Sequence, residues 1–395
     1  MNEELPTAEQ PTLALGYLTL VDSAPMIAAE ALGLYEQLGL SVTLHREVSW
    51  ANLRDKLVAG HYDAVQMLAP LPAMTTLGAS GLRAPLITGL VLSRNGNAIT
   101  LGNHLLPAET DLEAIRQAPT ATEAAFRQGA ALARHQANQH EPLTFGVVHS
   151  FSSHTILIRR WLRQAGLDPD IDARFLVVPP SQMPDSLAQG LIDGFCAGEP
   201  WNSQAVADGS GFIATSGVDV WRDAPEKTLC VNDRWQQEHP ATHTRLQLAL
   251  LAACAWLAKP EHRHTFARIL SDRLYLDLPE AVLMPALTGE LRFHRDEQPR
   301  NINDYLIFDP RVAGRPDAAE GQYLIEQCAE LIGKAIDPKT VETLIRNTYR
   351  SDLFDPVYDY FLRLPLDSAL RSPAAPTSLR SAMEDDDERS NAQRP

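Results

Sequence analysis

The N-terminal part of the chain alternates between apolar runs and segments with helical spacing, and this alternation constrains the fold most. Leu13–Leu20, Leu40–His45 and Asp63–Leu68 have the apolar character of buried strands. Pro25–Leu38 and Trp50–Ala59, which lie between them, repeat apolar side chains at helical intervals. The order strand, helix, strand, helix, strand predicts a parallel sheet with helical crossovers.

The middle of the chain repeats this pattern after a turn signal. Leu86–Arg94 is a predicted strand that runs into Asn95-Gly96-Asn97, a sequence typical of a turn. Residues 107–140 are then mostly helical, and strands alternate with helices as far as Gly198. From about Leu229 the chain is again apolar and helical, which indicates a return to the first unit.

A discontinuous first lobe with an inserted second lobe follows from these patterns. Lobe I is expected to comprise residues 12–97 and 220–371, and lobe II residues 98–219. The cleft between two such lobes is a usual place for a ligand. Residues 1–11 and 372–395 are expected to be disordered. For residues 372–395 the reason is that a Pro/Ser-rich linker is followed by a block of acidic residues.

The net charge of the chain limits the kinds of macromolecule that it can bind directly. The chain has 395 residues, and its formal net charge of −16 is not offset by any cluster of lysine and arginine. Nucleic acid and anionic membranes are therefore poor direct partners. The N-terminal sequence is acidic and polar and has none of the features of an export signal, so a cytoplasmic protein is expected if Met1 is the true start.

No catalytic or metal-binding motif is recognisable. The sequence has no Gly-x-Ser-x-Gly, phosphate-binding loop, Cys-x-x-Cys or His-Glu-x-x-His. Cys196 and Cys254 lie in apolar runs and are expected to be buried, reduced thiols. His262-Arg263-His264 lies in a polar stretch and indicates a solvated helix start. A binding protein without metal or cofactor is therefore favoured over an enzyme.

Several polar residues fall where a small anion could be bound. Gly198 ends a predicted strand in Gly-Glu-Pro-Trp, and Lys227 follows in Pro-Glu-Lys. Ser153 is expected to cap a helix that begins at His154, where free backbone N–H groups and the helix dipole favour an anion. Each residue also has a plainer interpretation. His154 fits a core-edge histidine, Lys227 an exposed lysine after a proline turn, and Trp50 a packing residue.

Four segments together resemble the nitrate- and bicarbonate-binding proteins that serve ABC importers. They are Ser49-Trp50-Ala51-Asn52-Leu53-Arg54-Asp55, Gln66-Met67-Leu68-Ala69-Pro70-Leu71-Pro72, Ser153-His154-Thr155 and the stretch 194–204. They occur in the family's order. The resemblance implies an α/β fold of the type II periplasmic-binding-protein kind, with two lobes and a hinged ligand cleft.

The resemblance also implies a ligand set. The family's tryptophan, histidine, glycine and lysine match Trp50, His154, Gly198 and Lys227, and its glutamine matches Asn97, which is one methylene shorter. We expect these side chains to line an open cleft, so that replacing Trp50 or His154 weakens binding without unfolding the protein. A wider set has lesser roles: Gln66 as a wall residue, Asp22 as a cleft residue or helix cap, and Trp201 as packing near the hinge.

Lys227 favours one anion over the other. In the bicarbonate-binding branch this position resembles an acidic residue, which accepts the hydroxyl of bicarbonate but repels nitrate. A lysine supplies positive charge and donors instead, so the resemblance implies nitrate or nitrite.

Members without export signals resemble the cytoplasmic nitrate/nitrite sensors of the NasS type. This resemblance implies a partner, an ANTAR-type, NasT-like antiterminator that is sequestered without the anion and released with it. Two alternatives stay open: a nitrate-binding component of an ABC importer, and an enzyme like the thiamine-pyrimidine synthases, whose cysteine-rich signature is absent here.

Overall fold

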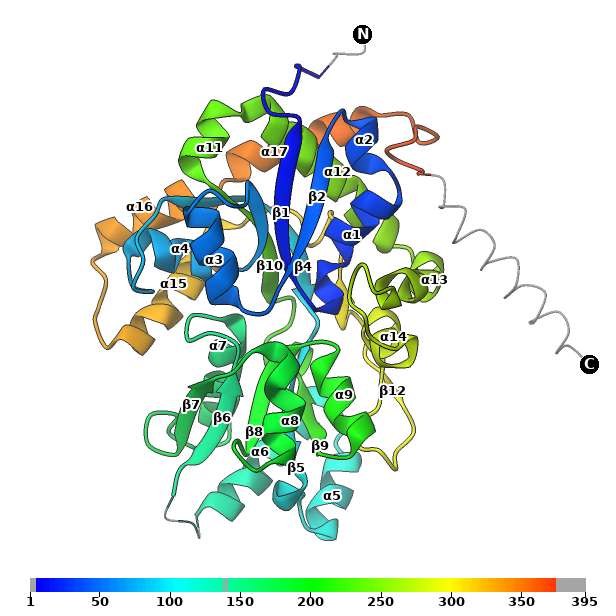
Figure 1. Cartoon of the computed structure of the whole chain (residues 1–395). Helices are drawn as coiled ribbons and strands as arrows, with labels where there is room; N and C mark the ends of the chain where they lie inside the picture. Colours follow the sequence, from blue (N-terminus) through cyan, green and yellow to red (C-terminus); the bar gives the residue numbers. More distant parts are fainter. Residues whose placement is uncertain (1–4, 138, 140, 374–395) are drawn as a thin grey trace, which may run out of the picture.

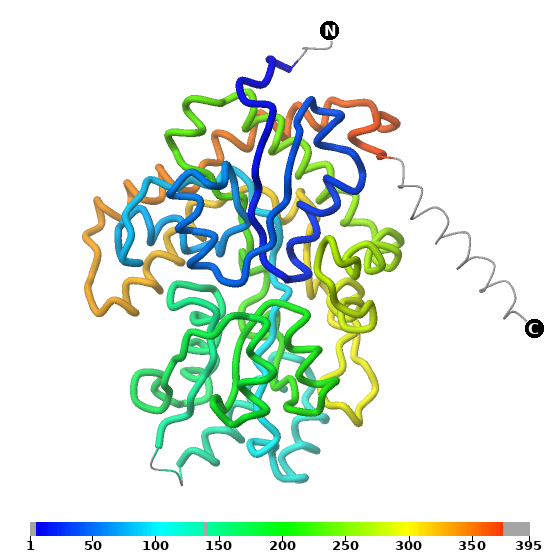
Figure 2. Tube along the Cα trace, viewed as in Figure 1, coloured from blue at the N-terminus to red at the C-terminus, as the bar shows by residue number. Residues whose placement is uncertain are grey.

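The chain folds into two α/β lobes, each built on its own sheet, in a computed structural model (Figure 1). The structure describes residues 5–137, 139 and 141–373. In Figure 2 the chain passes from the upper lobe to the lower one and returns, so the upper lobe holds both ends of the described chain. The predicted fold, a two-lobed binding-protein architecture, is confirmed. The expected disorder of residues 1–4 and 374–395 lies outside the described residues.

The lobe I sheet has the strand order β13-β4-β10-β3-β1-β2. Its strands are β1 (Thr12–Leu18), β2 (Ser41–Glu47), β3 (Ala64–Leu68), β4 (Leu86–Asn95), β10 (Pro225–Asn232) and β13 (Leu306–Ile307). β1 pairs in parallel with β2 and β3, as the alternating pattern predicts. β10 is antiparallel to both of its neighbours, β3 and β4.

The lobe II sheet has the order β7-β6-β8-β5-β9. Its strands are β5 (Asn97–Gly102), β6 (Leu143–Val147), β7 (Ala173–Val177), β8 (Gly194–Gly198) and β9 (Gly211–Ser216). β6 is parallel to β7 and β8, whereas β5 is antiparallel to β8 and β9. A separate pair, β11 (Glu290–Leu291) and β12 (Arg300–Asn301), is antiparallel.

Helices cover both sheets (Figure 1). Those of the first pass through lobe I are α1 (Ala24–Ala31), α2 (Leu34–Gln37), α3 (Trp50–Val58) and α4 (Leu71–Leu77). Those inserted in lobe II are α5 (Glu109–Arg116), α6 (Ala121–Gln136), α7 (Ser153–Gln164), α8 (Met183–Ala188), α9 (Trp201–Asp208) and α10 (Gly217–Val220). Those that follow β10 are α11 (Asp233–Glu238), α12 (Pro240–Leu257), α13 (Pro260–Ser271), α14 (Glu280–Thr288), α15 (Ala318–Ile332), α16 (Pro338–Thr348) and α17 (Ser351–Arg363). Short 3-10 turns are η1 (Val21–Ser23), η2 (Asn103–Leu105) and η3 (Pro180–Gln182).

The turn signal Asn95-Gly96-Asn97 marks a crossing between the lobes. β4 ends at Asn95, Gly96 has a φ of +81°, and β5 begins at Asn97 in the other sheet. The return crossing lies beside it, because Asn95 and Ala224 exchange hydrogen bonds of 3.0 Å: the Asn95 amide donates to the Ala224 carbonyl, and the Ala224 amide to Asn95 Oδ1. The start of β10 is thus fixed at the junction of the lobes.

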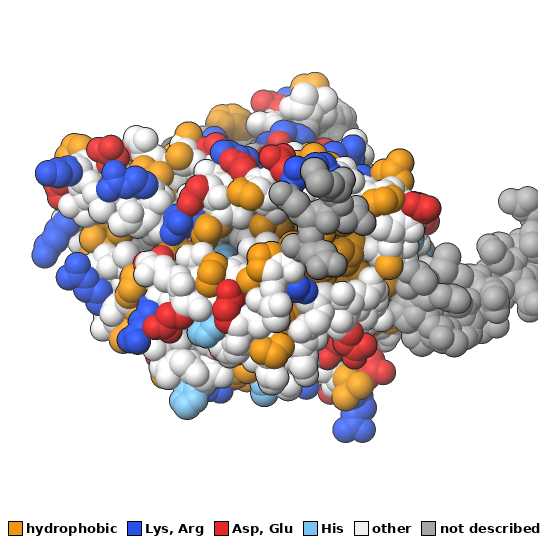
Figure 3. All heavy atoms as spheres, turned by 90° about the horizontal axis from the view of Figure 1, so that it is seen from above, with side chains coloured by type: hydrophobic (Ala, Val, Ile, Leu, Met, Phe, Trp, Pro, Cys, Tyr) orange, Lys and Arg blue, Asp and Glu red, His pale blue; other side chains and the backbone are white. Residues whose placement is uncertain are grey.

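The N-terminal segment of the described chain is bonded to lobe I. Residues 5–11, which lie within the segment expected to be disordered, are joined to α12 by hydrogen bonds: Glu9 accepts from the Ala241 and Thr242 amides. Figure 3 shows acidic and basic side chains interspersed over the face that it presents. No helix within the described residues combines the length and apolar character that crossing a membrane requires.

Candidate functional site

The residues expected to bind an anion meet where the two lobes face each other. Trp50 begins α3 and Lys227 lies in β10, both in lobe I. Asn97 begins β5, His154 lies in the first turn of α7, and Gly198 ends β8, all in lobe II. The site is therefore shared between the lobes, and its geometry depends on how they are arranged.

Capping residues fix the helix ends that present Trp50 and His154. Ser49 is the N-cap of α3 and its hydroxyl accepts from the Asn52 amide at 3.2 Å. Ser152 is the N-cap of α7 and accepts from the Thr155 amide at 3.1 Å. The prediction that Ser153 caps this helix is therefore wrong. Because the Ser152 hydroxyl makes the capping hydrogen bond, the Ser153 hydroxyl is available for a different hydrogen bond.

Glu226, a carboxylate that no sequence motif marks as a site residue, lies at the centre of these residues. Its Oε1 is 2.8 Å from His154 Nε2, an ion-pair distance, although the contact lacks the angle of a hydrogen bond. Lys227 Nζ donates to the same oxygen. Oε2 accepts from Asn97 Nδ2 at 2.9 Å and from the Ser153 hydroxyl. Donors from both lobes thus converge on one planar carboxylate.

An irregularity in β10 explains why neighbouring Glu226 and Lys227 both reach the site. In regular β structure, successive side chains point to opposite faces. Here the register with β4 jumps: Pro225 faces Arg94, and Lys227 faces Ser93, which leaves Glu226 without a partner in that ladder. Such a bulge re-aims the side chains around it. The signal in the sequence was a charged pair next to Pro225.

Asp22 supplies a second carboxylate. Its Oδ2 is 2.9 Å from Lys227 Nζ, and its Oδ1 accepts from Gln66 Nε2 at 2.7 Å. Gln66 in turn accepts from the Leu18 amide at 3.3 Å, which fixes its side chain. Asp22 is thus the partner of Lys227 rather than a helix cap, and Gln66 orients that partner. Trp201 is a packing residue whose Nε1 donates to the Thr19 carbonyl at 3.1 Å.

The site is closed to solvent, not an open cleft. The polar and aromatic side chains of the site are between 0% and 2% exposed. The set comprises Asp22, Trp50, Asn97, His154, Glu226 and Lys227. The expectation that Trp50 and His154 line an open cleft is therefore wrong, because both side chains are buried and the Trp50 ring packs in the hydrophobic core.

Burial makes the charges of the site depend on one another. Burial raises the pKa of the Asp22 carboxyl, and Lys227 offsets part of the rise. Burial also raises the pKa of Glu226, but His154 and Lys227 lower it by more, so it lies well below its ordinary value. For Lys227, burial lowers the pKa, but Asp22 and Glu226 together raise it above its ordinary value. Lys227 and Glu226 are therefore charged at neutral pH.

Three further details describe the donors and the packing of the site. Trp50 Nε1 and His154 Nδ1 have no hydrogen-bond partner within the described chain. The Lys227 ammonium lies 5.3 Å from the centre of the Trp50 ring, within cation–π range. A Cβ at Gly198 would lie 3.2 Å from Asp22 Oδ2, so a side chain there would press on the carboxylate.

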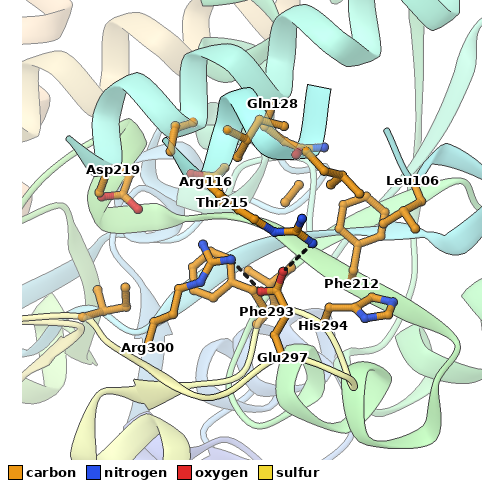
Figure 4. Close-up of a pocket in the computed structure, with 18 of the residues that line it drawn as sticks. Leu106, Arg116, Gln128, Phe212, Thr215, Asp219, Phe293, His294, Glu297 and Arg300 are labelled. Carbon is orange, nitrogen blue, oxygen red and sulfur yellow. Dashed lines mark hydrogen bonds and ion pairs between the residues drawn. The ribbon is translucent and has the colours of Figure 1, made fainter. Parts of the chain in front are cut away.

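The site has no metal-binding cluster among the described residues and is separate from a cavity that lies beside α5 and α6. Among the described residues, no group of three or more His, Cys, Asp and Glu side chains is arranged to hold a metal ion. The cavity of about 520 Å³ in Figure 4 lies between α5, α6, β9 and residues 293–302. Glu297 pairs with Arg116 and Arg300 at this cavity, which contains none of the predicted ligands.

Comparison with known protein families identifies the family of this chain. The profile of the NMT1-like family matches residues 6–271. The chain belongs to the NMT1-like family. It is also similar to proteins named for nitrate and for bicarbonate, which confirms the resemblance drawn from its motifs.

Two relatives illustrate this similarity. The nitrate import ATP-binding protein NrtC of Synechocystis sp. is 33% identical over 349 residues, which cover 88% of this chain and 50% of NrtC. The bicarbonate transport ATP-binding protein CmpC of the same organism is 37% identical over 323 residues, covering 81% of this chain and 46% of CmpC. The chain thus spans about half the length of these relatives.

A solved structure matches over nearly the whole chain. The periplasmic nitrate-binding protein NrtA from Synechocystis PCC 6803 superposes with a TM-score of 0.81 and 26% sequence identity. The match covers 94% of this chain and 93% of NrtA. The two-lobed fold is therefore that of a solved binding protein.

Proposed function

We propose that the chain binds nitrate or nitrite between its lobes and acts as a cytoplasmic sensor of that anion. The observation that carries the proposal is the convergence of His154, Asn97 and Lys227 on one carboxylate. A carboxylate presents two oxygens in a plane, as nitrate and nitrite do. Donors that satisfy one such group are placed to satisfy another of the same shape and charge.

Lys227 supports nitrate and nitrite over bicarbonate. Its ammonium donates but cannot accept, so it offers nothing to the hydroxyl that distinguishes bicarbonate. The relatives include proteins named for nitrate and for bicarbonate. Our choice of nitrate or nitrite over bicarbonate rests on Lys227.

The sensor role rests on a ligand that touches both lobes. Asn97 and His154 belong to lobe II, whereas Trp50 and Lys227 belong to lobe I. An anion bound between them favours one arrangement of the lobes, and a partner that docks across both lobes responds to that preference. We propose that this partner is an ANTAR-type, NasT-like antiterminator, which is sequestered without nitrate and released with it.

Size-exclusion chromatography with the purified antiterminator tests the switch. We expect the two proteins to co-elute in nitrate-free chloride buffer and to separate when nitrate replaces chloride at equal ionic strength. Equal ionic strength matters because simple screening also weakens complexes between charged surfaces. Co-elution that does not change with nitrate contradicts the switch.

A second candidate is a binding component of an anion importer. It is favoured by the relatives named for nitrate import and bicarbonate transport, of which this chain covers about half. Failure to form a complex with the antiterminator in either buffer, together with nitrate-dependent association with an importer's ATP-binding subunit, supports this candidate instead.

A further inference from the structure

The anion site already contains an anionic group of the protein itself. Glu226 uses the side-chain donors of Asn97, Ser153 and Lys227, and lies within ion-pair distance of His154. These include three of the residues that match the family's ligand set. The carboxylate lies beside the N-terminal turn of α7, where a helix favours negative charge.

We propose that the Glu226 carboxylate is an internal ligand of this pocket, which an external planar oxyanion must displace in order to bind. This inference rests on the proposed function, and it assigns to Glu226 the role of setting affinity and selectivity. The anion takes over the donors, and the carboxylate moves away from them.

The charge balance requires displacement rather than addition. Two carboxyl groups, Asp22 and Glu226, already share the Lys227 ammonium, and all three side chains are almost completely buried. A further anion placed beside both carboxylates is a buried charge without a partner, which is strongly unfavourable. Once Glu226 has moved out, one carboxylate, one ammonium and the histidine surround the anion.

Displacement also preserves the contacts between the lobes. Glu226 belongs to the lobe I strand β10, and its contacts with Asn97, Ser153 and His154 reach lobe II. The bulge at Pro225–Lys227 leaves Glu226 outside the ladder with β4, so its side chain can move without breaking that pairing. An incoming anion then joins the same donors across the lobes.

An internal competitor lowers the apparent affinity by the fraction of time that it vacates the site. The test is calorimetric titration of nitrate and of formate, a minimal carboxylate, into wild type, Glu226→Ala and Glu226→Gln. Lys227 keeps Asp22 as a partner at 2.9 Å in both variants, so neither leaves the ammonium unpaired. Glu320→Gln is the control, because Glu320 pairs with Arg94 and does not contact the site.

We expect Glu226→Ala to bind nitrate at least tenfold more tightly than wild type, and to gain formate binding that wild type lacks. Glu226→Gln keeps the size of the side chain, is expected to bind nitrate more tightly than wild type, and remains informative if the alanine variant does not fold. Glu320→Gln is expected to bind as wild type does.

The remaining outcomes distinguish the internal-ligand proposal from the proposed function. Equal or weaker nitrate binding by the Glu226 variants, with wild type still binding, overturns the internal-ligand proposal and leaves the proposed function standing. Formate binding gained by Glu226→Ala, with no nitrate binding by wild type, supports the internal ligand but contradicts the proposed function. Variants that bind neither anion overturn the internal-ligand proposal.

Discussion

Lys227→Met is expected to destabilise the protein by about 3–5 kcal/mol at pH 7, the range found when one partner of a buried ion pair is removed. Lys227 is completely buried, and its ammonium contacts both Asp22 and Glu226. Its loss leaves two carboxylates in a closed site. Urea unfolding measures the effect, and exposed Lys334→Met is the control, expected to change stability by less than about 0.5 kcal/mol.

The effect of Lys227→Met should shrink in acid. The lowered pKa of Glu226 gives the wild type stability that is present above its ordinary value of 4.5 and is lost as the pH falls below it. In the variant, burial without the ammonium raises the pKa of the Asp22 carboxyl further, so stability is lost as the pH rises through that value instead. The two proteins therefore converge between pH 7 and pH 4. A loss below about 1 kcal/mol that does not vary with pH contradicts this assignment of charges.

Trp50→Ala is expected to cost about 3–5 kcal/mol of stability, as is usual for removing a buried aromatic ring. Trp50 has no exposed surface, packs in the hydrophobic core and carries an Nε1 without a partner among the described residues. Trp50→Phe is the informative comparison. It keeps most of the buried ring but removes the indole donor, so its loss of stability is expected to be smaller, about 1–2 kcal/mol.

The same pair of variants separates packing from binding. If Trp50 Nε1 donates to the anion, Trp50→Phe weakens nitrate binding by about tenfold, or 1.4 kcal/mol. Trp50→Phe that binds nitrate as tightly as wild type shows that the tryptophan only packs.

The fold was predictable where local pattern and tertiary environment agree. β1, β2 and β3 are apolar runs separated by amphipathic segments, so their parallel pairing follows from the sequence. β10 is different, because its first half is buried but carries Glu226 and Lys227, so the apolar run that indicates a buried strand covers only its second half. Its charged side chains contact residues far away in the chain, such as Asp22 and His154, which no local rule can identify.

The candidate site also contains residues that the sequence identified and one that only the structure shows. Trp50, Asn97, His154, Gly198 and Lys227 were identified by resemblance to family motifs, and the structure brings them together. Their plainer interpretations were equally compatible with spacing alone. Glu226 was overlooked because a regular strand directs it away from Lys227, and only the bulge in β10 brings both side chains to one site.

Calorimetric titration of the wild-type protein with nitrate, nitrite and bicarbonate at matched ionic strength tests the central claim most directly. We expect nitrate or nitrite to bind at one site, and bicarbonate to produce no binding heat over the same concentration range. Binding of bicarbonate without nitrate or nitrite, or no heat with any of the three, contradicts an interlobe nitrate or nitrite site governed by Lys227.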